Sequence, residues 1–123
     1  MAAPNLIGAT TIIGKTTGAN LTTTSATTIL SNASSSGKVL KINTLNASNW
    51  TTSSANVSVV WNNAASLGGT SYNITSNLVI PAGATLTVID KSTQYYLEEN
   101  QSIGAIAATA NTINVTVSYE DIS

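Results

Sequence analysis

The feature that most constrains the fold is a period-two alternation of apolar and polar residues. It is clearest near the carboxyl end, where the alternating apolar positions are Ile113, Val115, Val117 and Tyr119. Successive side chains of a β-strand point to opposite faces of its sheet. This segment is therefore predicted as a strand with one buried face. No stretch of a dozen residues carries the apolar stripe of an amphipathic helix, so we expect little helix.

The same alternation recurs at residues 57–61 and 85–88. Further strands are expected at residues 7–13, 20–30 with a bend near Ser25, 39–45, 71–74, 78–80 and 94–97. Residues 103–108 suit a strand or a helix, because their alanines are compatible with both. Turn signals lie between these segments, at residues 34–37, 46–55, 62–70, 81–83 and 98–102. About eight short strands with turns at this spacing predict an all-β fold, a two-sheet antiparallel β-sandwich.

We expect residues 1–123 to form a single domain, with an amino-terminal arm over residues 1–5. Thr, Val and Ile support the strand assignment because β-branched side chains pack well on a pleated sheet. A jelly roll is preferred for the strand order. An immunoglobulin-like sandwich stays open as the alternative, since it produces the same alternation.

Composition excludes several classes of function. Charged residues make up 7% of the chain, its net charge is −1, and it contains neither His nor Cys. Four lysines without arginine cannot form the basic stripe that neutralises a run of phosphates, so no nucleic-acid partner is expected. No apolar run reaches membrane-spanning length, so no membrane association is expected either. Without cysteine, the fold depends on packing and backbone hydrogen bonds.

The chemistry-bearing side chains show no catalytic pattern. A nucleophilic Ser or Thr needs a positioned base, and without His or Cys that base would be a lysine or a carboxylate. The lysines (Lys15, Lys38, Lys41 and Lys91) are predicted as solvated amines, and the acids (Asp90, Glu98, Glu99, Glu120 and Asp121) as solvated loop and terminal groups. We predict that the chain is not an enzyme and has no cofactor. A calcium site shared by the acidic clusters is the alternative to no metal, although no spaced acidic loop is present.

The polar segment 16–20 is a candidate attachment element, and two further features are candidates for an interface. One is the terminal arm of Met1, Ala2, Ala3, Pro4 and Asn5, because termini become ordered only where something holds them. The other is Trp50, which lies in a polar loop and suits a sugar platform or an interface anchor; folding of the ring over the edge of the core is the alternative. Trp61 and Tyr119 are in phase with apolar strand faces and are predicted to pack in the core. Eight Asn-x-Ser/Thr triplets are interpreted as chance matches in a chain rich in Ser and Thr.

Five segments resemble small β-sandwich virion proteins of tailed phages, especially marine cyanophages. They are NLIGATTIIGKT (5–16), GKVLKIN (37–43), IPAGATL (80–86), YLEE (96–99) and SYEDIS (118–123). The resemblance implies a non-enzymatic structural protein, foremost a capsid decoration or cement protein that binds and stabilises the shell. A tail or neck accessory protein and a carbohydrate-binding or adhesin module are the alternatives.

The same resemblance implies the partners and location of the protein. The expected partners are the major capsid protein or other virion proteins, and further copies of the chain, with a trimer favoured. The expected location is the virion, on the capsid surface rather than the tail, after synthesis in the host cytoplasm. The amino terminus lacks the pattern of a secretory signal, so release by assembly and lysis is expected.

Overall fold

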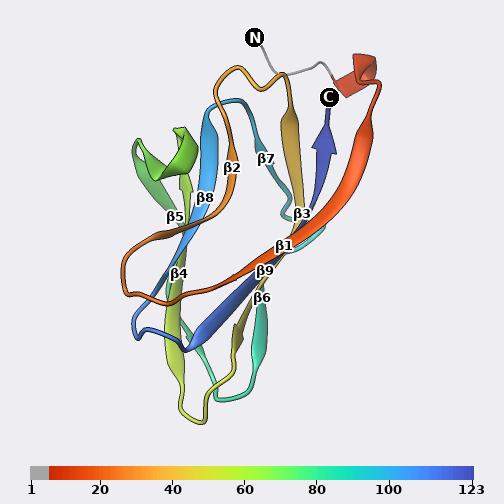
Figure 1. Cartoon of the computed structure of the whole chain (residues 1–123). Coiled ribbons are helices and arrows are strands. Elements are labelled where there is room, and N and C mark those ends of the chain that lie inside the picture. The colour runs from red at the N-terminus through yellow and green to blue at the C-terminus, as the bar shows by residue number, and fades with distance from the viewer. Residues whose placement is uncertain (1–5) are drawn as a thin grey trace.

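The computed structural model describes residues 6–123, in which nine strands form two antiparallel sheets packed face to face (Figure 1). The strands are β1 (Ile12–Asn20), β2 (Thr27–Asn32), β3 (Val39–Asn49), β4 (Ala55–Asn62), β5 (Ser71–Ile80), β6 (Thr85–Ile89), β7 (Tyr95–Leu97), β8 (Gln101–Ala107) and β9 (Ile113–Ile122). Two 3₁₀ turns, η1 (Leu6–Gly8) and η2 (Ala65–Leu67), are the helical elements of this part of the chain. The predicted two-sheet sandwich with little helix is confirmed.

The strand order is that of a jelly roll. One sheet has the order β1-β9-β3-β6, with β7 also pairing with β3, and the other has the order β2-β8-β4-β5. The first strands along the chain thus pair with the last in reverse sequence, β1 with β9 and β2 with β8, and β4 pairs with β5 in a hairpin. A long antiparallel ribbon rolled into two sheets produces this order. This strand order is the one preferred in the sequence analysis, and it differs from that of an immunoglobulin-like sandwich.

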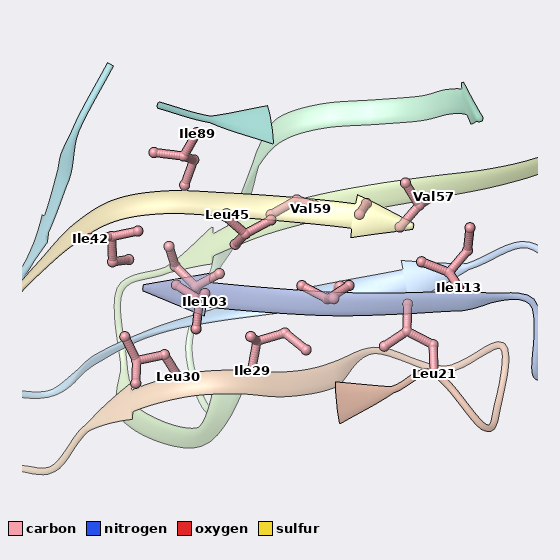
Figure 2. Packing of buried hydrophobic residues seen from close by; sticks show 14 of the residues in the cluster. Leu21, Ile29, Leu30, Ile42, Leu45, Val57, Val59, Ile89, Ile103 and Ile113 are labelled. Carbon is pink, nitrogen blue, oxygen red and sulfur yellow. The ribbon is translucent and has the colours of Figure 1, made fainter. Parts of the chain in front are cut away.

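The core lies between the sheets because the inward positions of the strands are apolar. In β9 the predicted alternation holds, with Ile113, Val115 and Val117 buried and Asn114 and Thr116 exposed. Figure 2 shows side chains of both sheets pointing toward one another across the core. Its labelled members are Leu21, Ile29, Leu30, Ile42, Leu45, Val57, Val59, Ile89, Ile103 and Ile113. Trp61 and Tyr119 are partly buried and pack against this cluster, which confirms the prediction made for both rings.

The expected strands at residues 7–13 and 20–30 are wrong in their bounds. Leu6–Gly8 forms a 3₁₀ turn, and β1 begins at Ile12. The chain then stays extended to Asn20, through glycines and threonines without an apolar period, because each of these residues pairs with β9. Residues 21–26 connect β1 to β2 across the sandwich, and their one buried large side chain is Leu21.

Other strand boundaries also differ from the predicted ones, because pairing with a neighbouring strand extends a strand beyond its apolar residues. β3 continues through residues 46–49, where a turn was expected, because they pair with β9 and β6. The two strands expected at 71–74 and 78–80 are one strand, β5, whose pairing with β4 shifts register. The ambiguous segment 103–108 is a strand, β8, central in its sheet between β2 and β4. The expected turn at 81–83 is confirmed, with Gly83 at φ 70°.

Candidate functional site

Asp121 is the centre of the chain's charged cluster. Its Oδ2 accepts a hydrogen bond from Lys15 Nζ at 3.0 Å and another from Lys38 Nζ at 3.1 Å. The three side chains come from β9, β1 and the residue before β3. Asp121 is only 6% exposed, so the expectation that it would be a solvated terminal group is wrong. Its backbone pairs with Ile13 on one side and Leu40 on the other, which places it inside the sheet.

The contacts of the cluster shift the pKa values of Asp121 and Lys15. Burial alone raises the pKa of Asp121, but hydrogen bonds from Lys15 and Lys38, with their positive charges, outweigh burial and place the pKa below its ordinary value. The hydrogen bond to Asp121, followed by its charge, raises the pKa of Lys15. Both shifts favour the charged forms. The Lys15–Asp121 ion pair therefore remains charged through the neutral range.

The other charged groups are dispersed. Lys41 Nζ lies 4.0 Å from Glu120 Oε2 on partly exposed strands. Asp90 accepts hydrogen bonds from Ser92 and Thr93 in the turn after β6, and the hydrogen bond from the Ser92 hydroxyl is the largest of the contacts that lower its pKa. Across the described residues, no group of three or more His, Cys, Asp or Glu residues could hold a metal ion.

The second notable feature is β1, the edge strand of the five-stranded sheet. It pairs with β9 in an unbroken register from Ile12↔Ile122 to Asn20↔Asn114, and no strand of residues 6–123 pairs with its other side. Eight of its nine residues are exposed, Ala19 being the exception. A free edge presents a row of backbone donors and acceptors to any extended chain. Two large apolar side chains lie at the start of this strand: Ile12 is 62% exposed and Ile13 47%.

The remaining edges are less suited to pairing. β2 shifts register between Thr28 and Leu30 against its one neighbour, and β5 has register shifts with β4 and a positive φ at Asn77. β6 and β7 lie on the edge of the five-stranded sheet opposite β1, and they span only five and three residues. Bulges and short lengths are common ways to block edge pairing, as are charges. The charge on β1 is that of Lys15, and it is bound to Asp121. Thus β1 is the long, regular edge of the described sandwich.

Trp50 lies at the opposite end of β3 from the charged cluster. It follows Asn49, the last residue of β3, and its side chain is 53% exposed. Its backbone N–H donates to Thr112 O in the β8–β9 loop. The ring is not folded over the edge of the core. Met1, Ala2, Ala3, Pro4 and Asn5, the other candidate interface residues, lie outside the described residues.

Buried asparagines that the sequence analysis did not single out close the strand ends. Asn32, Asn49 and Asn62 are the last residues of β2, β3 and β4 and are at most 2% exposed. The amide group of Asn32 donates to Lys38 O and Leu97 O, and that of Asn49 to Ser53 O and Ile80 O. Asn32 and Asn49 begin two of the Asn-x-Ser/Thr triplets, and their amides are inaccessible in the folded chain. One pattern in the sequence could have indicated these buried residues: Asn recurs immediately before loops of small polar residues.

Comparison with known proteins adds no family to these observations. No protein-family model matches the sequence, and no curated protein matches it at a significant level. Within residues 6–123, no helix has the length and apolar character needed to cross a membrane.

Proposed function

We propose that this chain is a non-enzymatic structural protein of a tailed-phage virion, a capsid decoration protein that binds and stabilises the shell through the edge strand β1. The observation that carries the proposal is the nine-residue, unbroken and unblocked edge of β1 with Ile12 and Ile13 exposed on it. The jelly roll supports it as an analogy, since viral capsid domains use this architecture, as do lectins.

The proposed attachment is addition of a strand. An extended segment of a shell subunit pairs with the free backbone groups of β1, and this main-chain pairing supplies affinity. Ile12 and Ile13 point to opposite faces of the strand because side chains alternate. Each then contacts an apolar residue of the added segment on its own face. Contacts that exist only in the assembled shell stabilise the shell by mass action.

The absence of a catalytic role is part of the proposal. The carboxylates of Asp90, Glu98, Glu99, Glu120 and Asp121 each have a partner within the described chain. Adjacent acids in the β7–β8 turn and on β9 are bound to different partners. Such dispersal does not hold a reacting bond between two groups. Broad glycosidase and esterase panels should show no turnover.

We further propose that the protein forms a trimer on the capsid surface, with the major capsid protein as its partner; a tail or neck position is the alternative. A surface with few charges gives little repulsion between copies. Three linked copies would bind neighbouring shell subunits with a high effective concentration. Sedimentation of the full chain should give a trimer mass. Deletion of residues 1–5, followed by measurement of occupancy on particles, tests whether the arm takes part.

The test of attachment compares two lysine substitutions on exposed edge residues. Ile12→Lys adds a charge to β1, and Val79→Lys adds one to β5, where Val79 is 55% exposed. Each purified variant is mixed with shells of the encoding phage that lack the protein, and bound protein is measured by co-sedimentation. We expect Ile12→Lys to lose at least tenfold in affinity and Val79→Lys to bind as the parent does. Equal binding of both variants, or no binding of the parent chain, would contradict the proposal.

A carbohydrate-binding or adhesin module is the second candidate function, and the exposed ring of Trp50 favours it. An exposed tryptophan provides an apolar platform with a polar edge. Glycan-array binding that disappears in Trp50→Ala, with the fold retained, would support this function in place of the structural one.

A further inference from the structure

A pocket of about 240 Å³ opens between the two sheets at the end of the sandwich that holds Asp121. Leu30 and Ser31 of β2 form one wall, and Leu40 of β3 with Tyr119 and Asp121 of β9 form the other. Lys38 and Ala33, from the β2–β3 connection, lie at its rim. β1 curves away from β2 toward this end, where the carboxyl terminus also lies (Figure 1).

The pocket exists because the inward positions of β9 become polar near its end. Ile113, Val115 and Val117 are core residues, and the same alternation carries Tyr119 and then Asp121 onto the inner face. Their register partners on β3, Ile42 and Leu40, are also core residues. A hydrophobic side chain at Asp121 would continue the core. The carboxylate instead leaves the space between the sheets open and lines it.

One oxygen of this carboxylate is available to a ligand. Both lysines donate to Oδ2, and no hydrogen bond within residues 6–123 ends on Oδ1. No buried side-chain oxygen or nitrogen of this part of the chain lacks a partner. Oδ1 thus has no donor among the described residues, and it belongs to a side chain that lines the pocket and is 8% exposed. An acceptor fixed in this way is pre-organised for a donor that enters the pocket.

The charges select the kind of ligand. Lys38 and Asp121 line the pocket, whereas Lys15 binds Asp121 from β1 and does not. At the pocket wall a free anion is attracted by Lys38 but repelled by Asp121, and a cation meets the reverse. A neutral polyol avoids both conflicts: one hydroxyl donates to Asp121 Oδ1, and a neighbouring hydroxyl accepts from Lys38 Nζ, whose side chain is 45% exposed and has donors to spare. Leu30, Leu40 and the Tyr119 ring supply an apolar wall for the C–H face of such a molecule.

We propose that this pocket binds the terminal sugar of a glycan. The pocket is smaller than sites for drug-sized ligands, which occupy roughly 300–1,000 Å³, so one sugar ring is the expected occupant. Asp121 accepts from one hydroxyl and Lys38 donates to the next. This activity goes beyond shell binding, and it uses residues of the inter-sheet pocket rather than the free edge of β1. Trp50, at the other end of β3, takes no part.

The test is an NMR titration of the ¹⁵N-labelled full chain with a panel of methyl glycosides of common hexoses, N-acetylhexosamines and deoxyhexoses. We expect at least one glycoside to shift the amide signals of Ser31, Lys38 and Tyr119. Asp121→Asn should weaken that binding at least tenfold. Ala33→Trp fills the rim from an exposed position and should abolish it, which keeps the test decisive if Asp121→Asn is poorly folded. Trp50→Ala is the control and should bind as the parent does.

Three results would overturn the proposal. One is that no glycoside shifts the pocket signals. Another is binding that is lost in Trp50→Ala and retained in Ala33→Trp, which would place the sugar at the opposite end. The third is tighter binding of inorganic phosphate than of any glycoside, which would make the pocket an anion site. None of these results bears on shell attachment, which the lysine substitutions on β1 and β5 test separately.

Discussion

Asn49 Nδ2 donates a hydrogen bond to Ile80 O at 2.9 Å, and this bond joins the last residue of β3 in one sheet to the last residue of β5 in the other. Asn32 makes the corresponding link at the opposite end, from β2 to Leu97 O of β7. The sandwich is thus fastened at both ends by buried amide groups. Loss of such a bond is costly because a buried carbonyl without a donor has given up its hydrogen bonds to water on folding and has no partner in the protein to replace them.

Replacement of Asn49 by alanine should therefore destabilise the fold. Two carbonyl oxygens lose their donor, and the expected loss is about 2 kcal/mol in the free energy of unfolding. Urea denaturation monitored by tryptophan fluorescence measures it. Asn114→Ala is the control, because Asn114 is an exposed strand residue, and it should change stability by less than about 0.5 kcal/mol. Equal effects of the two substitutions would show that the sheet-to-sheet bond contributes nothing.

The ion cluster around Asp121 should make stability depend on pH in the acid range. The folded-state pKa of Asp121 lies below its unfolded value, near 3.8. Its contribution is then complete above that value and is lost as the pH falls through the folded-state pKa. The raised pKa of Lys15 adds a contribution that is complete below its unfolded pKa and is lost as the pH rises through the folded-state value. Between these limits the cluster is fully charged.

Asp121→Asn should reduce the acid-range dependence of stability by the part that comes from Asp121. We expect the variant to be about 1 kcal/mol less stable than the parent at pH 7, a value reduced from that of buried charged hydrogen bonds because both lysines are nearly half exposed. Denaturation curves from pH 2 to pH 8 should converge at the acid end. Glu98→Gln, a carboxylate with no ion pair among the described residues, is the control. A constant difference between parent and Asp121→Asn across this range would contradict the assigned pKa direction.

Gly83 tests the turn between β5 and β6. Ala84 N–H donates to Pro81 O at 3.1 Å, and Gly83 adopts φ 70°, which is strained for other residues. Gly83→Ala should cost about 1 kcal/mol of stability. Gly14→Ala in β1 is the matched control, because no atom lies within 4 Å of the added methyl group and φ is not in the left-handed region. Thermal unfolding should show a lower midpoint for Gly83→Ala than for Gly14→Ala. Equal midpoints of the two variants would show that the turn tolerates alanine.

Alternation predicted the part of the fold in which packing decides the structure. β9, β4 and β6 have inward apolar and outward polar residues, and all three were predicted from the sequence. β1 could not be predicted in this way, because residues 14–20 have no apolar period and are extended only through pairing with β9, about a hundred residues away. The jelly-roll order likewise depends on long-range pairing, and the alternation is the same in an immunoglobulin-like sandwich.

The candidate sites were harder to predict because they depend on burial. Asp121 stands near the end of a polar stretch, and nothing local indicates that two lysines far away in the sequence bind it. Asn32 and Asn49 resemble loop residues, yet the loops close over them. Trp50 was singled out because an apolar ring in a polar loop is anomalous in the sequence itself, and its exposure in the structure keeps it available.

Hydrogen exchange of the full chain, free and bound to shells, tests attachment through β1 most directly. Mass spectrometry follows the backbone amides of β1 and compares them with those of β4 and β8 in the other sheet. We expect rapid exchange of the outward amides of β1 in the free chain and strong protection of these amides on the shell, with β4 and β8 unchanged. Protection of other surfaces on the shell, with β1 exchanging as fast as in the free chain, would contradict it.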